Sequence, residues 1–455
     1  MLFASCRQID EEAPEQIYYI EASESFYIPE ISEETITETT AETTAEETSA
    51  KTTAAETAEE TTTEETTTET TTETTTETTT ETTTETTTET TTETTAETTT
   101  EAATETTAEE PVLYRGSYPA DDGLVKAMGR TFMRDGVRIL SHTCSGVEFA
   151  FRGTCADVTL TSSCKSSKAR AAFYVNGEQV TDTMLNNEEE TFRVFESEKP
   201  KNCIISIVKL SESAYSNIGV KSIDVTSEYG IIPTPERQRK IEFIGDSITC
   251  GYGVDAANQY EAFATTNENG MKTYAAITAD YFKADYNVVA WSGIGVYSSY
   301  TESSSPNQSF LMPSIYGKTA PNELADDMWD FSRWQPDVVV INLGTNDNTW
   351  TKGIQERADK FGAAYYDFIV QVRQANPNAY IICSLGVMGS KLLPEIREQI
   401  ELYSANTGDY RIAAFEFDYR DGETDGFGAG YHPSAVTHQK MADKLIPFIA
   451  ETMGW

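Results

Sequence analysis

The sequence predicts an α/β domain, in which a parallel sheet lies between layers of helices, preceded by an all-β sandwich of the jelly-roll type. Three changes in composition and hydrophobic pattern along the 455 residues predict this fold class. Threonine and glutamate dominate residues 33–110, short alternating apolar runs fill residues 111–232, and strands alternate with helices in residues 236–455. Each of these patterns is typical of a different kind of structure. We therefore expect three segments and leave residues 1–32 unassigned.

The threonine and glutamate segment is predicted to be a disordered linker. Glutamate recurs at every fourth residue from Glu65 to Glu105. In a helix this spacing would stack like charges on one face, and the intervening β-branched threonines are poor helix formers. We therefore expect an extended, self-repelling spacer whose threonines would suit O-glycosylation on an exported protein. The alternative is an acidic tail without a specific role.

The distribution of charged and apolar residues argues against a nucleic-acid partner and against a membrane span. The formal net charge is −41, of which residues 1–110 carry −28, so the remaining 345 residues carry only about −13. No basic patch with interleaved aromatic residues is present, and we expect no nucleic-acid partner. No run approaches the ~18 apolar residues of a membrane span, so no membrane span is expected.

The cysteines and the first residues of the chain each leave two interpretations open. Seven cysteines show no Cys-x-x-Cys spacing, which argues against a zinc or redox site. Four of them fall within residues 144–203, where disulfides and free thiols are both compatible with the sequence.

Residues 1–8 lack the basic start and apolar core of a signal peptide, and we interpret residues 1–32 as a truncated start or the remnant of another module.

The all-β prediction rests on short alternating runs separated by turn residues. Asn176 and Gly177 follow one such run and are typical of a tight hairpin turn. No catalytic constellation stands out here, and residues 230–240, with two prolines, are the expected linker. The predicted strands of this domain are residues 136–140, 146–151, 155–160, 170–175, 191–195 and 203–210.

From residue 240 onward, apolar runs alternate with amphipathic stretches. Such alternation indicates crossover connections and a parallel sheet with helices on both faces, whose chemistry lies at the carboxyl ends of the strands. The predicted strands are residues 241–244, 286–291, 337–343, 380–385 and 411–417. The predicted helices are residues 274–282, 323–334, 354–374, 394–404 and 433–453.

Polar residues suited to acyl transfer follow three of these strands and precede the last helix. Ser247 comes after the first strand, Gly293 after the second and Asn346 after the third. They offer a hydroxyl, a backbone N–H and a side-chain amide, and His432 before the last helix offers an imidazole. Because the ends of parallel strands meet at one edge, we expect these groups to lie together.

Only three histidines compete for the role of base. His142 lies in the all-β domain and His438 within the last helix, where packing roles are expected. His432 directly precedes a proline at the start of that helix, which favours it as the base.

Three neighbouring side chains are interpreted alongside this set. Asp246 and Asp347 flank the active groups and are interpreted as loop-fixing carboxylates. Trp350 is a candidate platform for a sugar ring, with core packing as the alternative.

The short motifs around Ser247, Gly293, Asn346 and His432 resemble the conserved motifs of the SGNH or GDSL hydrolase superfamily. The resemblance covers residues 240–455. The phrase Ile-Gly-Asp-Ser-Ile-Thr-Cys-Gly-Tyr-Gly, together with a preceding β-sandwich, resembles more narrowly carbohydrate esterase family 2. The resemblance implies that Ser247 is the nucleophile and His432 the general base. It also implies an oxyanion hole made of the backbone N–H groups of Ser247 and Gly293 and the amide of Asn346, with no metal and no organic cofactor.

The sequence departs from the superfamily pattern at one position. An Asp commonly stands three residues before the histidine, where this chain has Ala429. We expect a main-chain carbonyl within residues 428–430 to orient His432, in preference to the nearby carboxylates of Asp421, Glu423 and Asp425.

The resemblance implies an extracellular, monomeric acetylesterase that acts on acetylated plant-wall polysaccharides or oligosaccharides. Two alternatives remain open. The first is a lipase or esterase of the same superfamily acting on other small acyl esters. The second is a non-catalytic glycan-binding protein.

Overall fold

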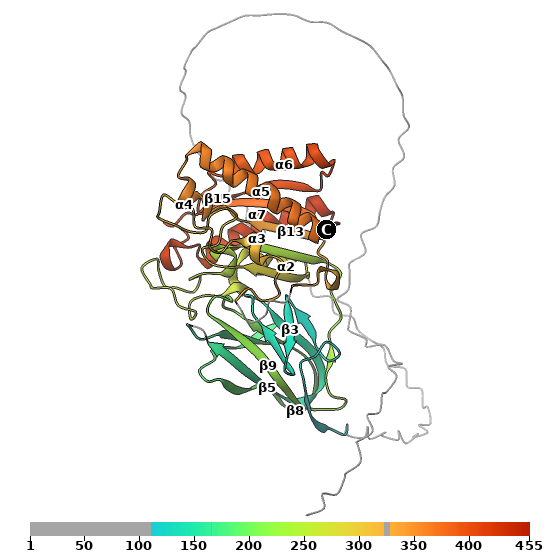
Figure 1. The fold of residues 1–455 in the computed structure, drawn as a ribbon. Helices are drawn as coiled ribbons and strands as arrows, with labels where there is room; N and C mark the ends of the chain where they lie inside the picture. The colour runs from blue at the N-terminus through green and yellow to red at the C-terminus, as the bar shows by residue number, and fades with distance from the viewer. Residues whose placement is uncertain (1–110, 165, 323–327) are drawn as a thin grey trace, which may run out of the picture. The chain divides into compact units, whose positions relative to one another are not determined.

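The computed structural model describes residues 111–164, 166–322 and 328–455 (Figure 1). The predictions for residues 1–32 and for the linker at residues 33–110 fall outside these ranges. The described residues belong to a single compact unit that extends to Trp455. They form an antiparallel β-domain followed by a parallel α/β domain, which confirms the predicted fold class.

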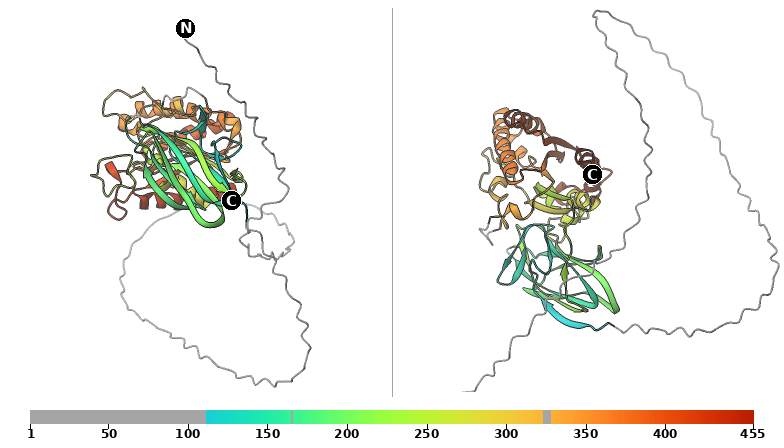
Figure 2. Two further views of the ribbon diagram at one scale, coloured as in Figure 1. Left: turned by 90° about the horizontal axis from the view of Figure 1, so that it is seen from below. Right: turned by 90° about the vertical axis from the view of Figure 1, so that its right-hand side faces the viewer.

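The β-domain is built around two long strands, β5 (Gly146–Cys164) and β8 (Glu189–Lys209), which pair with each other along most of their length. The first residues of β5 also pair with two short strands, whereas its later residues pair with β9 (Ser216–Ser227). This change of partner lets one hydrogen-bonded sheet enclose its own core (Figure 2). The remaining strands are β1 (Tyr114–Tyr118), β2 (Lys126–Met128), β3 (Thr131–Arg134), β4 (Val137–Leu140), β6 (Arg170–Val175), β7 (Glu178–Met184) and β10 (Ile232–Pro233).

The core of the β-domain comes from the alternating side chains of these strands. Phe149, Phe151 and Phe173 are fully buried in it, together with β-branched residues of β8 and β9. The predicted hairpin turn joins β6 to β7, with Asn176 and Gly177 both at positive φ. The described cysteines are all free thiols, so the disulfide alternative does not hold for them.

The five strands predicted for the second domain form one parallel sheet in the order β12, β11, β13, β14, β15. Their apolar runs are buried on both faces, as a doubly covered parallel sheet requires. Chain order changes direction between β12 and β13 on either side of β11, which places the end of β11 in the crevice where such sheets bind ligands. The strands are β11 (Lys240–Gly245), β12 (Asp285–Ala290), β13 (Val338–Asn342), β14 (Tyr380–Val387) and β15 (Ile412–Tyr419).

Helices cover both faces of this sheet. On one face, α2 (Tyr274–Tyr281) and α7 (Ala435–Met453) pack on the side chains of Val338 and Val340. On the other, α3 (Met312–Ile315), α5 (Gln355–Ala375) and α6 (Leu393–Thr407) pack on Val339 and Ile341. The side-by-side arrangement of α5 and α6 is visible in Figure 1.

One helix prediction is wrong in its described part. Residues 328–334, expected to continue a helix, contain only the single 3₁₀ turn η2 (Phe331–Arg333). Asp330 caps this turn by accepting the N–H of Ser332, and Trp334 then returns to extended backbone. Trp329 and Phe331 pack around the guanidinium of Arg130 instead of along a helix.

Arg130 belongs to the contacts that join the two domains. Its guanidinium, on the segment between β2 and β3, forms a fully buried ion pair with Glu242 of β11 at 2.8 Å. Glu242 also accepts the hydroxyl proton of Tyr316 at 2.7 Å. Because both charges are removed from water, their pairing fixes the β-domain directly against the strand that leads to Ser247.

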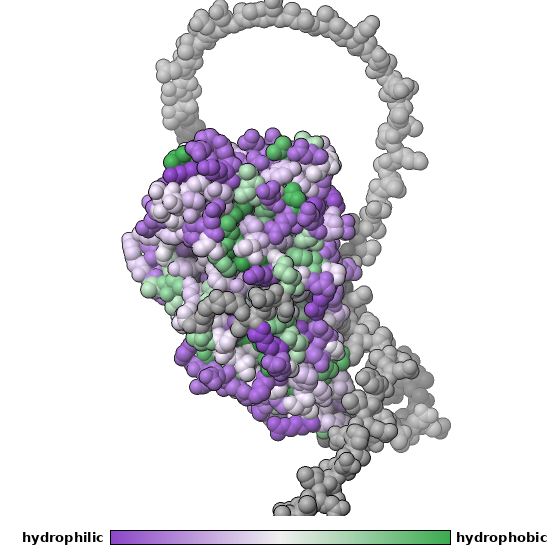
Figure 3. Space-filling model, viewed as in Figure 1, coloured by the Kyte–Doolittle hydropathy of each residue, from purple (hydrophilic) through white to green (hydrophobic). Residues whose placement is uncertain are grey.

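One face of the molecule is seen in the space-filling view of Figure 3. On the face drawn in Figure 3, hydrophilic side chains predominate and hydrophobic ones appear in separate small groups. Among the described helices, none is long and apolar enough to cross a membrane.

Candidate active site

Ser247 stands where the buried strand β11 turns into the four-residue helix α1 (Ser247–Cys250). Asp246 caps this helix, since its Oδ1 accepts the N–H of Ile248 at 3.0 Å. The turn gives Ser247 the first helical position, whose backbone N–H has no partner within a helix. The residue is buried, with 8% of its surface exposed.

His432 lies just before the last helix, α7, and its imidazole contacts Ser247. Its Nε2 lies 2.8 Å from the Oγ of Ser247. Its Nδ1 lies 3.1 Å from the carbonyl oxygen of Ala429, which can only accept. The proton of the neutral imidazole therefore resides on Nδ1, and Nε2 is free to accept the serine proton.

The contact with Ala429 lies within residues 428–430, where the sequence analysis expected a main-chain acceptor. The three carboxylates considered as alternatives are engaged elsewhere or exposed. Asp425 pairs with Lys440 at 2.6 Å, and Asp421 accepts bonds from its own turn. No described carboxylate forms a hydrogen bond with His432, whose two ring nitrogens contact the Ser247 hydroxyl and the Ala429 carbonyl.

A strained turn carries the histidine. Gly430 and Tyr431 both adopt left-handed backbone, with φ of 59° and 63°. This turn brings the carbonyl of Ala429 back toward His432, whose backbone N–H also donates to it at 3.1 Å. A non-glycine residue in this region stores backbone strain, which is common at functional sites.

The imidazole is held in an apolar surrounding. The ring of Tyr252 packs on it with centroids 4.2 Å apart, and Phe263 stacks on the other face of Tyr252. Burial disfavours the charged form and lowers the pKa of His432 to about 4, an effect that the positive charge of Arg420 adds to and the carbonyl of Ala429 opposes. His432 is therefore neutral, and able to act as a base, at pH 7.

The loop after β12 brings Gly293 to the same strand edge. Gly293 has a φ of 80°, and its carbonyl accepts the N–H of Tyr300 at 2.8 Å. Among the described residues, no protein acceptor pairs with the N–H of Gly293. This N–H is thus available to a ligand, as an oxyanion donor must be.

Asn346 lies beside the serine turn, as the convergence of strand ends requires. Its amide donates to the carbonyl of Ile294 at 2.9 Å and to the Oδ2 of Asp246 at 3.2 Å. The side chain therefore joins the loops that carry Ser247 and Gly293. To serve as an oxyanion donor it would have to exchange or share one of these acceptors.

The two flanking aspartates hold loops, which agrees with their interpretation from sequence. Asp347 accepts the backbone N–H groups of Val296, Tyr297 and Ser298 within 2.8–3.0 Å. Burial raises the pKa of Asp347 to about 6 and that of Asp246 to about 7. Neither carboxyl faces His432.

Trp350 does not fit the sugar platform that its position suggested. The residue is 4% exposed, and its indole N–H donates to the carbonyl of Ser304 at 3.0 Å. Tyr297 packs on the ring and the guanidinium of Arg357 lies over it. With these neighbours, no ring face is open to a sugar, and the packing alternative describes Trp350 correctly.

Sequence reasoning missed Gly253. Its φ is 63°, and a Cβ there would lie 2.7 Å from the backbone nitrogen of Ala429. Its own carbonyl accepts that N–H at 3.0 Å, so the serine turn and the histidine turn touch through Gly253. The closely spaced Gly251 and Gly253 were the available signal, because repeated glycines often mark close backbone approach.

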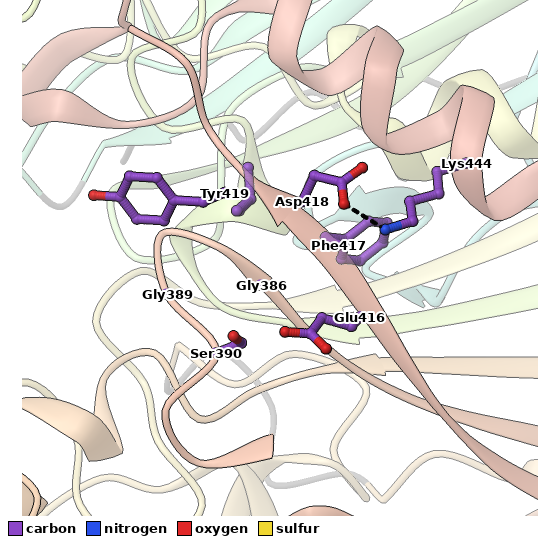
Figure 4. A pocket seen from close by; sticks show the side chains of 9 residues that line it. Gly386, Gly389, Ser390, Glu416, Phe417, Asp418, Tyr419 and Lys444 are labelled. Atoms are coloured by element: carbon purple, nitrogen blue, oxygen red, sulfur yellow. Dashed lines mark hydrogen bonds and ion pairs between the residues drawn. The ribbon is translucent and has the colours of Figure 1, made fainter. Parts of the chain in front are cut away.

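A separate hollow of about 250 Å³ opens at the ends of β14 and β15 (Figure 4). Glu416, Asp418 and Tyr419 line it, and Asp418 pairs with Lys444 at 2.6 Å. Its lining contains neither Ser247 nor His432, and it offers no imidazole or thiol. The acyl-transfer groups therefore lie outside this hollow.

Family comparisons agree with the geometry at two levels. The GDSL-like Lipase/Acylhydrolase family matches residues 241–445, which defines the class of the second domain. The Carbohydrate esterase 2 N-terminal family matches residues 127–235.

Known relatives narrow this class to one family. Cellulase/esterase CelE of Acetivibrio thermocellus is 34% identical over 68% of this chain, and the match spans only 37% of that relative. A family two carbohydrate esterase from Clostridium thermocellum, solved in complex with cellohexaose, is 32% identical, with a TM-score of 0.65, over 73% of this chain and 99% of its own. An acetyl xylan esterase (Est2A) from Butyrivibrio proteoclasticus is 26% identical, with a TM-score of 0.69, over 76% and 99%. The chain belongs to carbohydrate esterase family 2.

Proposed function

We propose that this protein is a carbohydrate O-acetyl esterase in which Ser247 is the nucleophile and His432 the general base. The observation that carries the proposal is the pair of contacts made by one imidazole, 2.8 Å to the Ser247 hydroxyl and 3.1 Å to the Ala429 carbonyl. They fix both the ring orientation and the tautomer that a base requires. No metal or organic cofactor takes part in the proposed reaction.

The reaction proceeds through an acetyl-enzyme. The Oγ of Ser247 attacks the acetyl carbonyl as its proton passes to the Nε2 of His432. When the bond between the acyl carbon and the sugar oxygen breaks, His432 gives that proton to the departing oxygen, which leaves as a sugar hydroxyl. Water attacks the acetyl-enzyme in the same way, releasing acetate and restoring the serine. The backbone N–H groups of Ser247 and Gly293, with the amide of Asn346, are the proposed donors to the oxyanion.

The carbonyl of Ala429 takes the place of a carboxylate in this scheme. It orients the imidazole and stabilises the transient imidazolium through its dipole, with less charge than an aspartate would supply. Burial lowers the pKa of His432 to about 4, and the hydrogen bond to the Ala429 carbonyl opposes this shift only in part. The dyad keeps its base neutral in mildly acidic solution.

The proposed substrate is an acetylated plant-wall polysaccharide or oligosaccharide outside the cell, processed by a monomer. The support is the acetyl xylan esterase named above and the cellohexaose held by the Clostridium thermocellum enzyme. Beside His432, the exposed rings of Tyr431 and Tyr260 lie 6.1 Å apart, with exposed fractions of 45% and 78%. Such rings can stack on the apolar face of a sugar, the role first considered for Trp350.

The test is acetate release by the full chain from acetylated xylan and acetylated glucomannan, with 4-nitrophenyl acetate and butyrate as small esters. The expected result is acetate from at least one polysaccharide, a preference for acetate over butyrate, and no release by the Ser247→Ala protein. Activity on aryl esters of any chain length but on neither polysaccharide would instead indicate an esterase for other small acyl groups.

A second function, glycan binding without hydrolysis, is favoured by the cellohexaose complex of the related structure. It predicts that the chain binds cellohexaose in calorimetry while releasing no acetate from any ester. Hydrolysis lost in the Ser247→Ala protein, with cellohexaose binding retained, would show that one site performs both functions.

A further inference from the structure

A buried group of charged side chains lies behind the loop that carries Gly293. Glu212 follows the end of β8 in the β-domain, and Glu268 belongs to the loop before α2. Together with Lys209 and Cys250, these two glutamates form one cluster, and all four side chains are fully buried. The proposed mechanism uses none of them, and burial of several ionisable groups is costly unless they are paired and hydrogen-bonded.

Glu212 touches both parts of the proposed active site. Its Oε2 accepts the backbone N–H of Ser292 at 2.8 Å, immediately before Gly293. The thiol of Cys250, at the end of the helix that begins with Ser247, lies 3.7 Å from the same oxygen. A single carboxylate from the β-domain therefore contacts the oxyanion loop and the nucleophile helix together.

The other contacts of this loop engage its carbonyl groups, and among the described residues the backbone N–H of Gly293 has no protein acceptor. The carbonyl of Gly293 is bound by the N–H of Tyr300, and the carbonyl of Ile294 is bound by the amide of Asn346. On the N-terminal side, the backbone N–H of Trp291 donates to the carbonyl of Gly245 at 3.3 Å. Glu212 adds a shorter bond, at 2.8 Å, directly before Gly293.

Glu212 is itself firmly held. Its backbone N–H donates to the Oε2 of Glu268 at 3.0 Å, and the ammonium of Lys209 donates to its backbone carbonyl at 2.9 Å. Lys209 also donates to the carbonyl of Ser211. These bonds restrict the residue to one position facing the loop.

The charges of the cluster are compatible with this role. Burial raises the pKa of both Glu212 and Glu268, and the negative charge of Glu212 raises that of Glu268 further, to well above its usual value. Burial also lowers the pKa of Lys209 to about 8, which leaves it charged at pH 7. The ammonium of Lys209 lies in the same buried cluster and lowers the pKa of both carboxyl groups, which partly offsets the effect of burial.

A metal ion is the competing occupant. Ligand atoms of Glu212, Glu268 and Cys250 lie within 4.8 Å of one another, a spacing that an ion would accept. The ammonium of Lys209 already places a positive charge in the same cluster, and the Oε2 of Glu212 is committed to Ser292. These two facts favour a positioning role over metal binding.

We propose that Glu212 is a positioning residue that fixes the Ser292–Gly293 peptide for oxyanion binding, so that the β-domain is part of the catalytic machinery. This inference rests on the proposed esterase function. It extends that function by assigning the β-domain an indirect part in oxyanion binding, through the position of the Ser292–Gly293 peptide.

The experiment compares Glu212→Ala and Glu212→Gln in the full chain with a matched control, Glu148→Ala. Glu148 is another buried carboxylate of the β-domain, bound to Ser206 and Thr234, without contact with the oxyanion loop. The measurements are kcat and KM on 4-nitrophenyl acetate, thermal unfolding, and hydrogen–deuterium exchange of the peptide covering residues 286–296.

For Glu212→Ala we expect kcat to fall about 10–100-fold with KM within about 3-fold, less than the loss of a whole oxyanion donor. Exchange in residues 286–296 should quicken. Glu212→Gln retains an oxygen acceptor and should recover most of the lost kcat, and Glu148→Ala should lower thermal stability while keeping kcat and that exchange unchanged.

The proposal is overturned if folded Glu212→Ala keeps kcat within about 3-fold of the parent and exchanges residues 286–296 at the parent rate. Equal losses in Glu212→Ala and Glu148→Ala would reduce the role to general stability. If the parent chain itself hydrolyses no ester, the esterase function fails, and the exchange data still decide whether Glu212 holds the loop.

Discussion

Replacing Gly253 with alanine tests the contact between the serine and histidine turns. A Cβ at this position would lie 2.7 Å from the nitrogen of Ala429 and 3.0 Å from its Cα, and closer still to its Cβ. Relieving the contact requires Ala429 to move by roughly 0.5–1 Å, and its carbonyl is the group that orients His432. A misplacement near 1 Å can cost about 10²-fold in rate, so kcat should fall by roughly 10–100-fold.

The same substitution also strains the backbone, since Gly253 has a φ of 63°. Strain and overpacking together should lower the free energy of unfolding by about 2–5 kcal/mol. Gly408 provides a matched control, because it has a φ of 72° and no atom within 4 Å of an added Cβ. Gly408→Ala should lose about 1–2 kcal/mol and keep its kcat.

The assay is urea unfolding of both variants together with kcat and KM on 4-nitrophenyl acetate. The reasoning is refuted if Gly253→Ala remains folded with kcat within about 3-fold of the parent, because the histidine turn would then tolerate the displacement. Equal activity losses in the Gly253 and Gly408 variants would also refute it, since backbone strain alone would explain them.

Three further predictions follow from the site and the domain contact. The lowered pKa of His432, about 4, means that the neutral base persists as the pH falls, so kcat/KM on an aryl acetate should keep about 90% of its plateau at pH 5 if that pKa governs it. A midpoint near the usual 6.5, with about 3% remaining at pH 5, would contradict this environment. Asn346→Ala should lower kcat by about 10²–10³-fold with a smaller change in KM, as loss of an oxyanion donor does, and an unchanged kcat would remove Asn346 from the oxyanion hole. Arg130→Met leaves Glu242 buried without its partner and should cost about 3–5 kcal/mol in urea unfolding, whereas Arg333→Gln, which breaks an exposed pair, should cost under about 1 kcal/mol.

The parallel sheet was predictable because its strands are nearly continuous apolar runs between recognisable helices. Sequence reasoning placed all five strands within a few residues, and the rule that strand ends meet at one edge brought Ser247, Gly293 and Asn346 together. His432 followed from the scarcity of histidines and from the proline after it. These features depend on local pattern and topology, which a single sequence carries.

Features set by tertiary contacts were not predictable in the same way. The stretch at residues 328–334 has apolar residues but no helix, because Trp329 and Phe331 surround Arg130 of the other domain. Trp350 follows a catalytic loop in sequence and yet points into the interior. Glu212 lies 80 residues before Ser292, and no local pattern indicates that the two meet.

The measurement that tests the dyad most directly is the rate of acetate release by Ser247→Ala, His432→Ala and Asp425→Asn beside the parent. The account predicts losses of at least about 10³-fold for the first two and a parent-like rate for Asp425→Asn, because the carboxylate of Asp425 faces Lys440 and the Ala429 carbonyl holds the imidazole. A folded Asp425→Asn protein that loses as much activity as Ser247→Ala would contradict the dyad, and full activity in His432→Ala would contradict the assignment of the base.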